Sequence, residues 1–308
     1  MYSLGIDTSN YKTSVALVDE DSNILVNIQQ FLDVKKGERG LRQSDAFFQH
    51  NTRLPELVNS VLVNEEYRKN ISCVSVSTRP RPVEGSYMPC FLAGEGYAKV
   101  IAQSLNVPCF SFSHQEGHIE AIRHFTELKD KKGFITFHFS GGTTEAILVD
   151  NKYEIVAKTK DISFGQVLDR VGVAIGYDFP CGQEIDRLAR ECEIVKPVFT
   201  SIKVENGDIN LSGIETQAQK AVGRYDEKEI ACSLMLEICK AIAKIVEYLA
   251  KEYKINDYIF SGGVSSSIFL RNYITNKFPE YNIIFGNPKL STDNAVGIAL
   301  LGGKSIWR

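Results

Sequence analysis

The stretch that decides the fold is residues 4–24, LGIDTSNYKTSVALVDEDSNI, together with its counterpart at residues 135–155, ITFHFSGGTTEAILVDNKYEI. Each reads as a buried strand, a turn of small residues, a threonine, a second strand ending in Val-Asp, and a third strand. A repeat of this length is more than chance usually gives, so the sequence predicts two copies of a three-stranded meander. The turns alone are weaker evidence, because any α/β protein uses Gly, Ser and Thr in tight turns.

Strands and helices alternate around the two meanders. The expected strands are residues 2–8, 13–19, 24–30, 72–77, 108–112, 134–139, 144–149, 153–158, 257–261 and 281–285. The expected helices are residues 44–64, 90–105, a segment that starts near residue 114, and residues 164–176, 182–192, 228–253, 265–277 and 293–302. This order predicts an α/β fold.

The composition provides for a large core and shows no dominant charge. The chain has 308 residues, a net charge of −3 and seven cysteines, which are scattered and form no CxxC pair. Such cysteines are typical of buried thiols in a reducing cytosol, and the sequence shows neither a signal peptide nor a membrane span. We therefore expect a cytoplasmic protein without a membrane partner. RNA binding would need a local basic patch or a partner protein.

Two of the five histidines, His114 and His118, lie four residues apart in the sequence HQEGH. On a helix this spacing puts both imidazoles on one face, where they can hold one divalent metal ion. The alternative is a helix face with two incidental histidines. The motif is not the HExxH of zinc proteases, because Glu116 comes one position too late for that geometry.

Two further turns of small residues are candidate anion sites. Ser140-Gly141-Gly142 follows the first strand of the second meander, and Ser261-Gly262-Gly263-Val264 lies between an expected strand and an expected helix. Backbone N–H groups in such turns, and at the start of a helix, bind phosphate groups. Together with the first turn they indicate a nucleotide-binding protein.

Taken in this order, the motifs resemble those of the TsaD/Gcp family, once called O-sialoglycoprotein endopeptidases, over essentially the whole chain. The matching segments are Ile6-Asp7-Thr8-Ser9, His50 upstream of Leu54-Pro55, residues 114–118, 140–142, 165–169, 180–186, 211–213 and 261–264, and Ser291-Thr292-Asp293-Asn294. The resemblance implies an actin-like (ASKHA) α/β fold with two duplicated subdomains around a nucleotide cleft. Residues 1–132 with 291–308 would carry the histidine pair, and residues 133–290 the nucleotide-binding turns and helices.

The resemblance implies a metal site made of His114, His118 and Asp293. His138 takes the place of a family tyrosine two residues before the second turn, and we treat it as a further candidate ligand. Three imidazoles and one carboxylate would favour zinc or iron over magnesium. The alternatives are that Asp293 caps the last helix and that His138 packs beneath the turn.

The resemblance also implies that the second subdomain binds ATP or an adenylate. The candidate nucleotide-binding residues are Ser9, Ser140, Gly141, Gly142, Thr143, Asp169, Gly182, Asp186, Gly262, Gly263 and Ser267. Asp169 and Asp186 would accept hydrogen bonds from the ribose. The alternative is that both are solvated surface residues paired with the arginine that follows each of them.

The chain departs from the family pattern near the expected chemistry. Tyr11 and Lys12 stand where the family has acidic residues, and Thr143, Gln166 and Ser267 replace other family residues. The sequence RPRP at residues 79–82 replaces a family loop, RGPG, and its arginines suit phosphate binding. The catalytic residues are unknown, with Asp7, Lys12 and Arg79 as candidates. These changes indicate a divergent paralogue.

The resemblance implies a transferase, not a protease, that moves threonylcarbamoyl from threonylcarbamoyl-AMP to an adenosine of tRNA and so forms threonylcarbamoyladenosine. The tRNA would dock with the help of partner proteins, and a homo- or heterodimer would form through the N-terminal subdomain. Two alternatives remain open. One is an ATP- or adenylate-dependent carbamoyl-type transferase that acts on a small acceptor, and the other is a non-catalytic nucleotide-binding scaffold.

Overall fold

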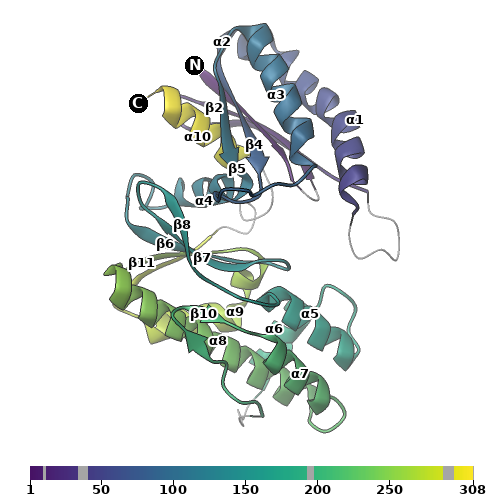
Figure 1. Cartoon of the computed structure of the whole chain (residues 1–308), viewed down its shortest axis with the longest axis vertical. Coiled ribbons are helices and arrows are strands. Elements are labelled where there is room, and N and C mark those ends of the chain that lie inside the picture. Colours follow the sequence, from purple (N-terminus) through teal and green to yellow (C-terminus); the bar gives the residue numbers. More distant parts are fainter. Residues whose placement is uncertain (10–11, 34–40, 193–197, 287–294, 308) are drawn as a thin grey trace. The chain divides into compact units, whose positions relative to one another are not determined.

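The computed structural model describes residues 1–9, 12–33, 41–192, 198–286 and 295–307. These form two compact units (Figure 1). Unit 1 comprises Met1–Lys129 and Lys289–Arg308, and unit 2 comprises Asp130–Pro288. None of the helices in the described ranges is long and apolar enough to cross a membrane.

Unit 1 is built on a five-stranded sheet with the order β3-β2-β1-β4-β5. Its strands are β1 (Tyr2–Thr8), β2 (Lys12–Asp19), β3 (Ile24–Phe31), β4 (Ile71–Arg79) and β5 (Cys109–Ser113). The first three form the predicted antiparallel meander, and β4 and β5 add in parallel beside β1. The β1–β2 pairing runs out to Thr8 and Thr13, which fixes both ends of the first small-residue turn.

Helices pack on both faces of this sheet because β2 is apolar on both sides. Val15 and Leu17 join the core formed with α1 (Gln43–Leu62) and α3 (Phe91–Leu105), while Ala16 and Val18 pack with α10 (Val296–Ile306). Alternate residues of a strand point to opposite faces, so α10 covers the face opposite to α1 and α3 (Figure 1).

The histidine-bearing helix α4 (His114–Arg123) packs against α10 through two glycines. A Cβ atom on Gly297 would lie 1.8 Å from the carbonyl oxygen of Gly117, and one on Gly117 would lie 2.8 Å from Cδ1 of Ile298. The first separation is a clash with backbone, so this helix contact requires glycine at position 297, whereas the flexible end of the Ile298 side chain could shift for a methyl group on Gly117.

Unit 2 repeats the strand order of unit 1. Its strands are β6 (Phe134–Phe139), β7 (Thr144–Val149), β8 (Tyr153–Lys158), β11 (Asp257–Ser261) and β12 (Asn282–Phe285). Strands β6, β7 and β8 form an antiparallel meander, and β11 and β12 add in parallel beside β6. The predicted duplication is therefore present, with the β6–β7 pairing ending at Phe139 and Thr144 on either side of the second turn.

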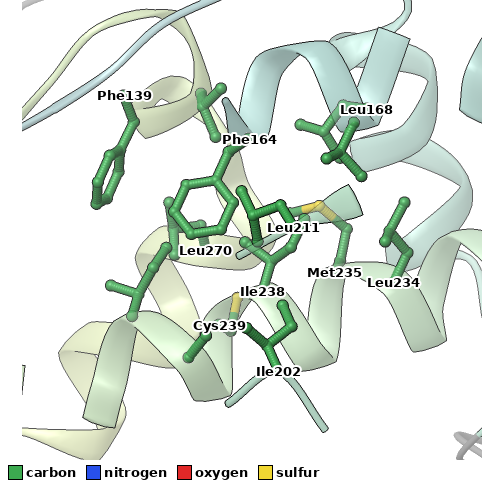
Figure 2. Packing of buried hydrophobic residues seen from close by; sticks show 14 of the residues in the cluster. Phe139, Phe164, Leu168, Ile202, Leu211, Leu234, Met235, Ile238, Cys239 and Leu270 are labelled. Atoms are coloured by element: carbon green, nitrogen blue, oxygen red, sulfur yellow. The ribbon is translucent and has the colours of Figure 1, made fainter. Parts of the chain in front are cut away.

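The core of unit 2 lies between this sheet and its helices. The helices are α5 (Phe164–Ile175), α6 (Gly182–Arg190), α7 (Ser212–Ala221), α8 (Glu227–Tyr253) and α9 (Ile268–Lys277). Figure 2 shows Phe139 from β6 beside Phe164 from α5, with Met235 and Ile238 of α8 in the same cluster. The two phenylalanine rings meet edge to face at 5.2 Å, which locks the start of α5 against the end of β6.

Several elements differ from the sequence prediction. Helix α2 (Glu65–Asn70) and the two-residue strands β9 (Val204–Glu205) and β10 (Asp208–Ile209) were not expected, because such short elements carry too few residues for a periodic pattern. Helix α7, with ten residues, was not expected either. The helix expected at 265–277 is instead a 3₁₀ turn, η1 (Gly263–Ser266), followed by α9, because the Ser267 hydroxyl caps a new helix start. Helix α6 ends at Arg190, and α10 runs to Ile306 rather than to residue 302.

The glycine contact between α4 and α10 can be tested by substitution. We expect Gly297→Ala to lower the free energy of unfolding by about 1–3 kcal/mol, because the new methyl group forces the two backbones apart. Urea denaturation would measure the change. The matched control is Gly96→Ala in the middle of α3, where a Cβ atom meets nothing within 4 Å. It should leave stability unchanged or raise it by up to about 1 kcal/mol. Equal effects of the two substitutions would contradict the packing argument.

Candidate functional site

The two histidines of the HQEGH sequence meet at one end of α4. The helix begins at His114 because Ser113 and Glu116 form a capping box, in which each side chain bonds the backbone N–H of the other residue. Four residues later His118 returns to the same face, and its Nε2 atom lies 2.8 Å from Nε2 of His114. The predicted convergence of the two imidazoles on one face is therefore present.

Below His114, a buried carboxylate reaches up from the sheet. Asp7 near the end of β1 is completely buried, and its Oδ1 atom lies 2.9 Å from Nδ1 of His114. The Ser77 hydroxyl on β4 donates to the same oxygen at 2.5 Å. Sequence reasoning missed Ser77. Its only signal was that Ser75 and Ser77 stand at alternate positions among the apolar residues in the middle of the strand.

The donor set of this cluster suits a transition metal. Two Nε2 atoms bound to one ion at about 2.1 Å would be about 3.0–3.4 Å apart, slightly more than the 2.8 Å between His114 and His118. Among the described residues, no group of three or more His, Cys, Asp or Glu side chains could hold a metal. The expected ligand Asp293 lies outside the described residues, and His138 belongs to unit 2.

Glu116 is occupied by structural contacts. Its carboxylate accepts from the Ser113 backbone N–H at 2.6 Å and lies 3.6 Å from Nη2 of Arg79, which ends β4. The next residue, Pro80, accepts a hydrogen bond from the Gln115 backbone at 3.1 Å. These contacts tie the RPRP segment to the first turn of α4, and they engage the one glutamate that lies between the two histidines.

The ends of the first turn are held by a buried histidine. His50 on α1 is fully buried, with Nε2 2.8 Å from the Ser9 carbonyl oxygen and Nδ1 2.8 Å from Oγ1 of Thr13. A carbonyl oxygen only accepts, so Nε2 carries the proton and Nδ1 accepts from the Thr13 hydroxyl. Burial lowers the pKa of His50, and its hydrogen bond to Ser9 opposes that shift only in part.

Lys12 starts β2 and is also nearly buried. Its ammonium lies 3.1 Å from Oε1 of Gln29 and 4.5 Å from the centre of the Phe31 ring, both on β3. The positive charge that replaces the acidic residues of the family is thus engaged by the neighbouring strand. Tyr11 lies outside the described residues.

In unit 2, the second turn, residues 140–143, is closed by hydrogen bonds to Ser140 and has free space on its outer side. The Ser140 hydroxyl accepts from the backbone N–H groups of Gly142 and Thr143 at 3.3 and 3.0 Å. A Cβ atom on Gly141 or Gly142 would meet nothing within 4 Å. The N-cap of α5, Ser163, donates to the Gly141 carbonyl at 2.7 Å, which fixes the turn to the start of that helix.

The third turn packs its first glycine and exposes its second. Gly262 has a φ of +85°, and a Cβ atom there would lie 2.3 Å from the Phe139 carbonyl oxygen, so this position requires glycine for packing. Gly263 has nothing within 4 Å of a Cβ atom. Just before the turn, Ser261 donates to the Phe137 carbonyl and lies 3.2 Å from Nδ1 of His138. His138 therefore donates through Nδ1, and its lone pair is on Nε2.

The two predicted ribose carboxylates have different surroundings. Asp169 is half-buried and accepts from the Cys181 backbone N–H at 2.8 Å, just before Gly182 opens α6. Asp186 is buried and bonds the Ser267 hydroxyl and the Phe269 backbone N–H at the start of α9. The alternative that Asp186 is a solvated residue paired with Arg187 is wrong, because its ion pair is with Arg190 at 3.0 Å.

A further anchoring carboxylate escaped sequence reasoning. Asp161 accepts from the backbone N–H groups of Leu211 and Ser212 at 2.8 and 3.0 Å, and so it fixes the start of α7. Burial raises the pKa of Asp161, but these hydrogen bonds and one from Ile162 outweigh it and bring the pKa to about 2. Its sequence signal was weak, because a single aspartate between a strand and a helix is common in loops.

Comparison with known proteins identifies the family. The model of the TsaD family, described as tRNA N6-adenosine threonylcarbamoyltransferase, matches residues 24–300. This chain belongs to the TsaD family. Two curated proteins of that name, from Thermosipho melanesiensis and Chlamydia pneumoniae, are 28% and 27% identical to it. The alignments cover 99% and 100% of this chain and 94% and 92% of those proteins. The predicted activity, a transferase of tRNA modification rather than a protease, is the activity of the family and is confirmed at that level.

Solved structures that resemble this chain confirm the actin-like (ASKHA) α/β fold. HypF of T. kodakarensis has a TM-score of 0.65 at 13% identity, over 99% of this chain and 47% of HypF. The ROK hexokinase of Thermus thermophilus has a TM-score of 0.57 at 12% identity, over 99% of both chains. At these identities the likeness shows the fold alone.

The neutral His50 makes a testable contribution to pH dependence. Unfolded histidine binds a proton with a pKa near 6.5, and the folded pKa is lower, so the unfolded state binds more protons below pH 6.5. We therefore expect the contribution of the neutral His50 to the free energy of unfolding to be complete above pH 6.5. It should be lost as the pH falls from 6.5 toward the lower pKa of the folded state. Urea unfolding at pH 7.5 and 5.5 should show a smaller difference for His50→Phe than for the native chain.

The control for this experiment is Thr13→Val, which removes the hydroxyl partner of His50 but no titratable group. It should lower the free energy of unfolding by about 1–3 kcal/mol and leave most of the pH difference in place, because burial is the largest cause of the lowered pKa of His50. An unchanged pH difference in His50→Phe would show that other groups carry it.

Proposed function

We propose that this protein transfers threonylcarbamoyl from its adenylate to the N6 amine of an adenosine in tRNA, with a metal bound by unit 1 and a nucleotide bound by unit 2. The observation that carries the proposal is the histidine pair of α4, whose Nε2 atoms are 2.8 Å apart in a chain of the TsaD family. The family name supplies tRNA as the acceptor. The metal, the nucleotide and the site residues are proposals for this chain.

The reaction is an acyl-type transfer from one leaving group to one amine. The adenosine N6 nitrogen attacks the carbamoyl carbon of threonylcarbamoyl-AMP and forms the new N–C bond. The bond from that carbon to the phosphate oxygen breaks, AMP departs with the electron pair, and the attacking amine loses one proton. Negative charge grows on the phosphate as the bond breaks, so donors aimed at the phosphate stabilise the transition state.

On unit 1 the proposed metal ligands are His114 and His118, with Asp293 as the third. A bound ion would supply Lewis-acid chemistry and a fixed point for an oxygen of the substrate. Imidazole nitrogen suits zinc or iron better than magnesium, which prefers oxygen ligands. His138, the further candidate ligand of the sequence, belongs to unit 2 and stays a prediction. His118 is 7% exposed, so it is not a solvated surface histidine.

On unit 2 the proposed adenylate contacts are glycines that have free space beside their Cα atoms, together with the half-buried carboxylate of Asp169. Gly141, Gly142, Gly182 and Gly263 each have space where a Cβ atom would be, so a ligand can approach the backbone there. Ser140 and Thr143 shape the second turn around the first two of these glycines. Further candidates that already serve the fold are Asp186 and Ser267, through their side chains, and Gly262, through its packing.

The first turn and its neighbours are proposed to face the phosphate and the acceptor. Ser9 is buried, and its hydroxyl has no hydrogen-bond partner among the residues that the structure describes, which suits a donor to a bound anion. Arg79, held at the start of α4 by Glu116, is proposed as a phosphate contact. Asp7 and Lys12 are engaged inside unit 1 and are weaker candidates for contact with substrate.

Binding of tRNA is proposed to need a partner protein. The net charge of −3 gives no general attraction for a polyanion. Exposed aromatic side chains of unit 1, Phe31 and Phe48, at 69% and 67% exposure, are candidate partner contacts. Whether the partner is a second copy or another chain would follow from the mass of the purified complex.

The proposal predicts a defined loss on removal of the histidine pair. In cells that lack the gene, threonylcarbamoyladenosine should disappear from total tRNA, and the native gene should restore it. The double variant His114→Asn/His118→Asn should restore less than about one tenth and should retain less than one tenth of the bound metal. Nucleoside analysis of hydrolysed tRNA and elemental analysis of the purified protein measure the two quantities.

The matched control is His124→Gln, because His124 is another buried histidine that follows the same helix but lies outside the pair. It should keep both the modification and the metal. Unchanged threonylcarbamoyladenosine after deletion of the gene would exclude tRNA as the acceptor and leave the small-acceptor and scaffold alternatives.

A further inference from the structure

We propose that Asp7 is a positioning residue, whose carboxylate fixes the tautomer and ring orientation of His114 so that Nε2 of that imidazole faces the metal. The inference rests on the proposed metal site at the histidine pair. It gives a different role to a residue that the sequence put forward only as a catalytic candidate.

The hydrogen bond between Asp7 and His114 decides which imidazole nitrogen carries the proton. Oδ1 of Asp7 lies 2.9 Å from Nδ1 of His114. An ionised carboxylate only accepts hydrogen bonds, so the proton is on Nδ1 and the lone pair is on Nε2. Nε2 is the atom that lies 2.8 Å from the Nε2 atom of His118. The tautomer set by Asp7 is therefore the one that can bind a metal shared with His118.

The position of the Asp7 carboxylate is fixed from two sides. Asp7 lies on β1, and Ser77 lies on the adjacent parallel strand β4, where Ile6 pairs with Val76 one residue earlier on each strand. The Ser77 hydroxyl donates to the same Oδ1 atom that accepts from His114. Two donors from different elements thus converge on one oxygen, and the rigid sheet holds that oxygen beneath the helix.

Burial argues against direct contact of Asp7 with a substrate. The side chain is fully buried, and His114 above it is 19% exposed. A carboxylate in this place acts through the imidazole: it holds the ring and raises the basicity of the metal-binding nitrogen. In metalloproteins, loss of such a carboxylate typically weakens metal binding by about 10–100-fold.

The test measures zinc affinity in the full-length protein, with zinc(II) alone as the probe and a chromophoric chelator as competitor at one fixed pH. We expect Asp7→Asn to bind zinc about 10–100-fold more weakly. Ser77→Ala, which keeps the carboxylate but removes its second donor, should cause a smaller decrease. A zinc affinity of Asp7→Asn within twofold of the native value would overturn the proposal.

A tautomer measurement separates positioning from general loss of structure. In the metal-free native protein, the ¹⁵N shifts of His114 should report a proton on Nδ1. In Asp7→Asn the amide can donate to Nδ1, so the proton should move to Nε2. The backbone amide resonances far from the site should keep their native positions, which they would lose with a general loss of packing. A proton that stays on Nδ1 would contradict the role of Asp7. If Asp7→Asn does not fold, Ser77→Ala alone decides: weaker zinc binding supports the role, and unchanged binding overturns it.

Two comparisons distinguish this inference from the proposed function and from direct ligation. If His114→Asn/His118→Asn keeps its zinc, the metal site itself is wrong. If that double variant loses zinc and Asp7→Asn does not, only the positioning role fails. With cobalt(II) in place of zinc, the visible spectrum of Asp7→Asn should keep the shape of the native spectrum. A changed ligand-field pattern would make Asp7 a direct ligand and overturn the positioning role.

Discussion

The close contact between Gly117 of α4 and Gly297 of α10 sets the position of the histidine-bearing helix in unit 1. Helix α10 packs on β1, β2 and β4, so the depth of α4 above the sheet depends on how closely it approaches α10. With no Cβ atom on either glycine, the helix backbones touch. Only at that depth can His114 on the helix reach the carboxylate of Asp7 on the strand. The glycine contact between α4 and α10 thus supports the polar contact between His114 of α4 and Asp7 of β1.

The two units use one topology and place polar residues at equivalent positions. Thr8 pairs with Thr13 across the first meander and Phe139 with Thr144 across the second, so Asp7 in unit 1 corresponds to His138 in unit 2. Each lies beside a serine on the neighbouring parallel strand, Ser77 or Ser261. The duplication therefore repeats a pair of hydrogen-bonding side chains at the end of the first strand, in addition to the backbone. In unit 1 the pair is Asp7 and Ser77, and its carboxylate holds the imidazole of His114. In unit 2 the pair is His138 and Ser261, so the imidazole is itself a member of the pair.

The sequence predicted the parts of the fold that repeat or run long. Alternating apolar residues located the two meanders to within about one residue, and the long helices α1 and α8 were found because many turns repeat the same pattern. Helix α7 was missed, although Asp161 holds its start through backbone N–H groups. Such a contact joins residues 50 positions apart, and no local pattern records it. The departure of η1 from the expected helix at 265–277 has the same cause, because Asp186 and Ser267 define where α9 begins.

By itself the sequence determined the duplicated fold, the family and the spacing that brings His114 and His118 together, since each depends on periodicity or on residues close along the chain. Tertiary structure alone decided that Ser77 and Asp7 stand beneath His114, that His50 closes the first turn as a neutral imidazole, and that Asp186 is buried rather than solvated. The physical reason is the same in each case. Hydrogen bonds between side chains far apart in sequence depend on strand register and helix depth, which only the packed molecule fixes.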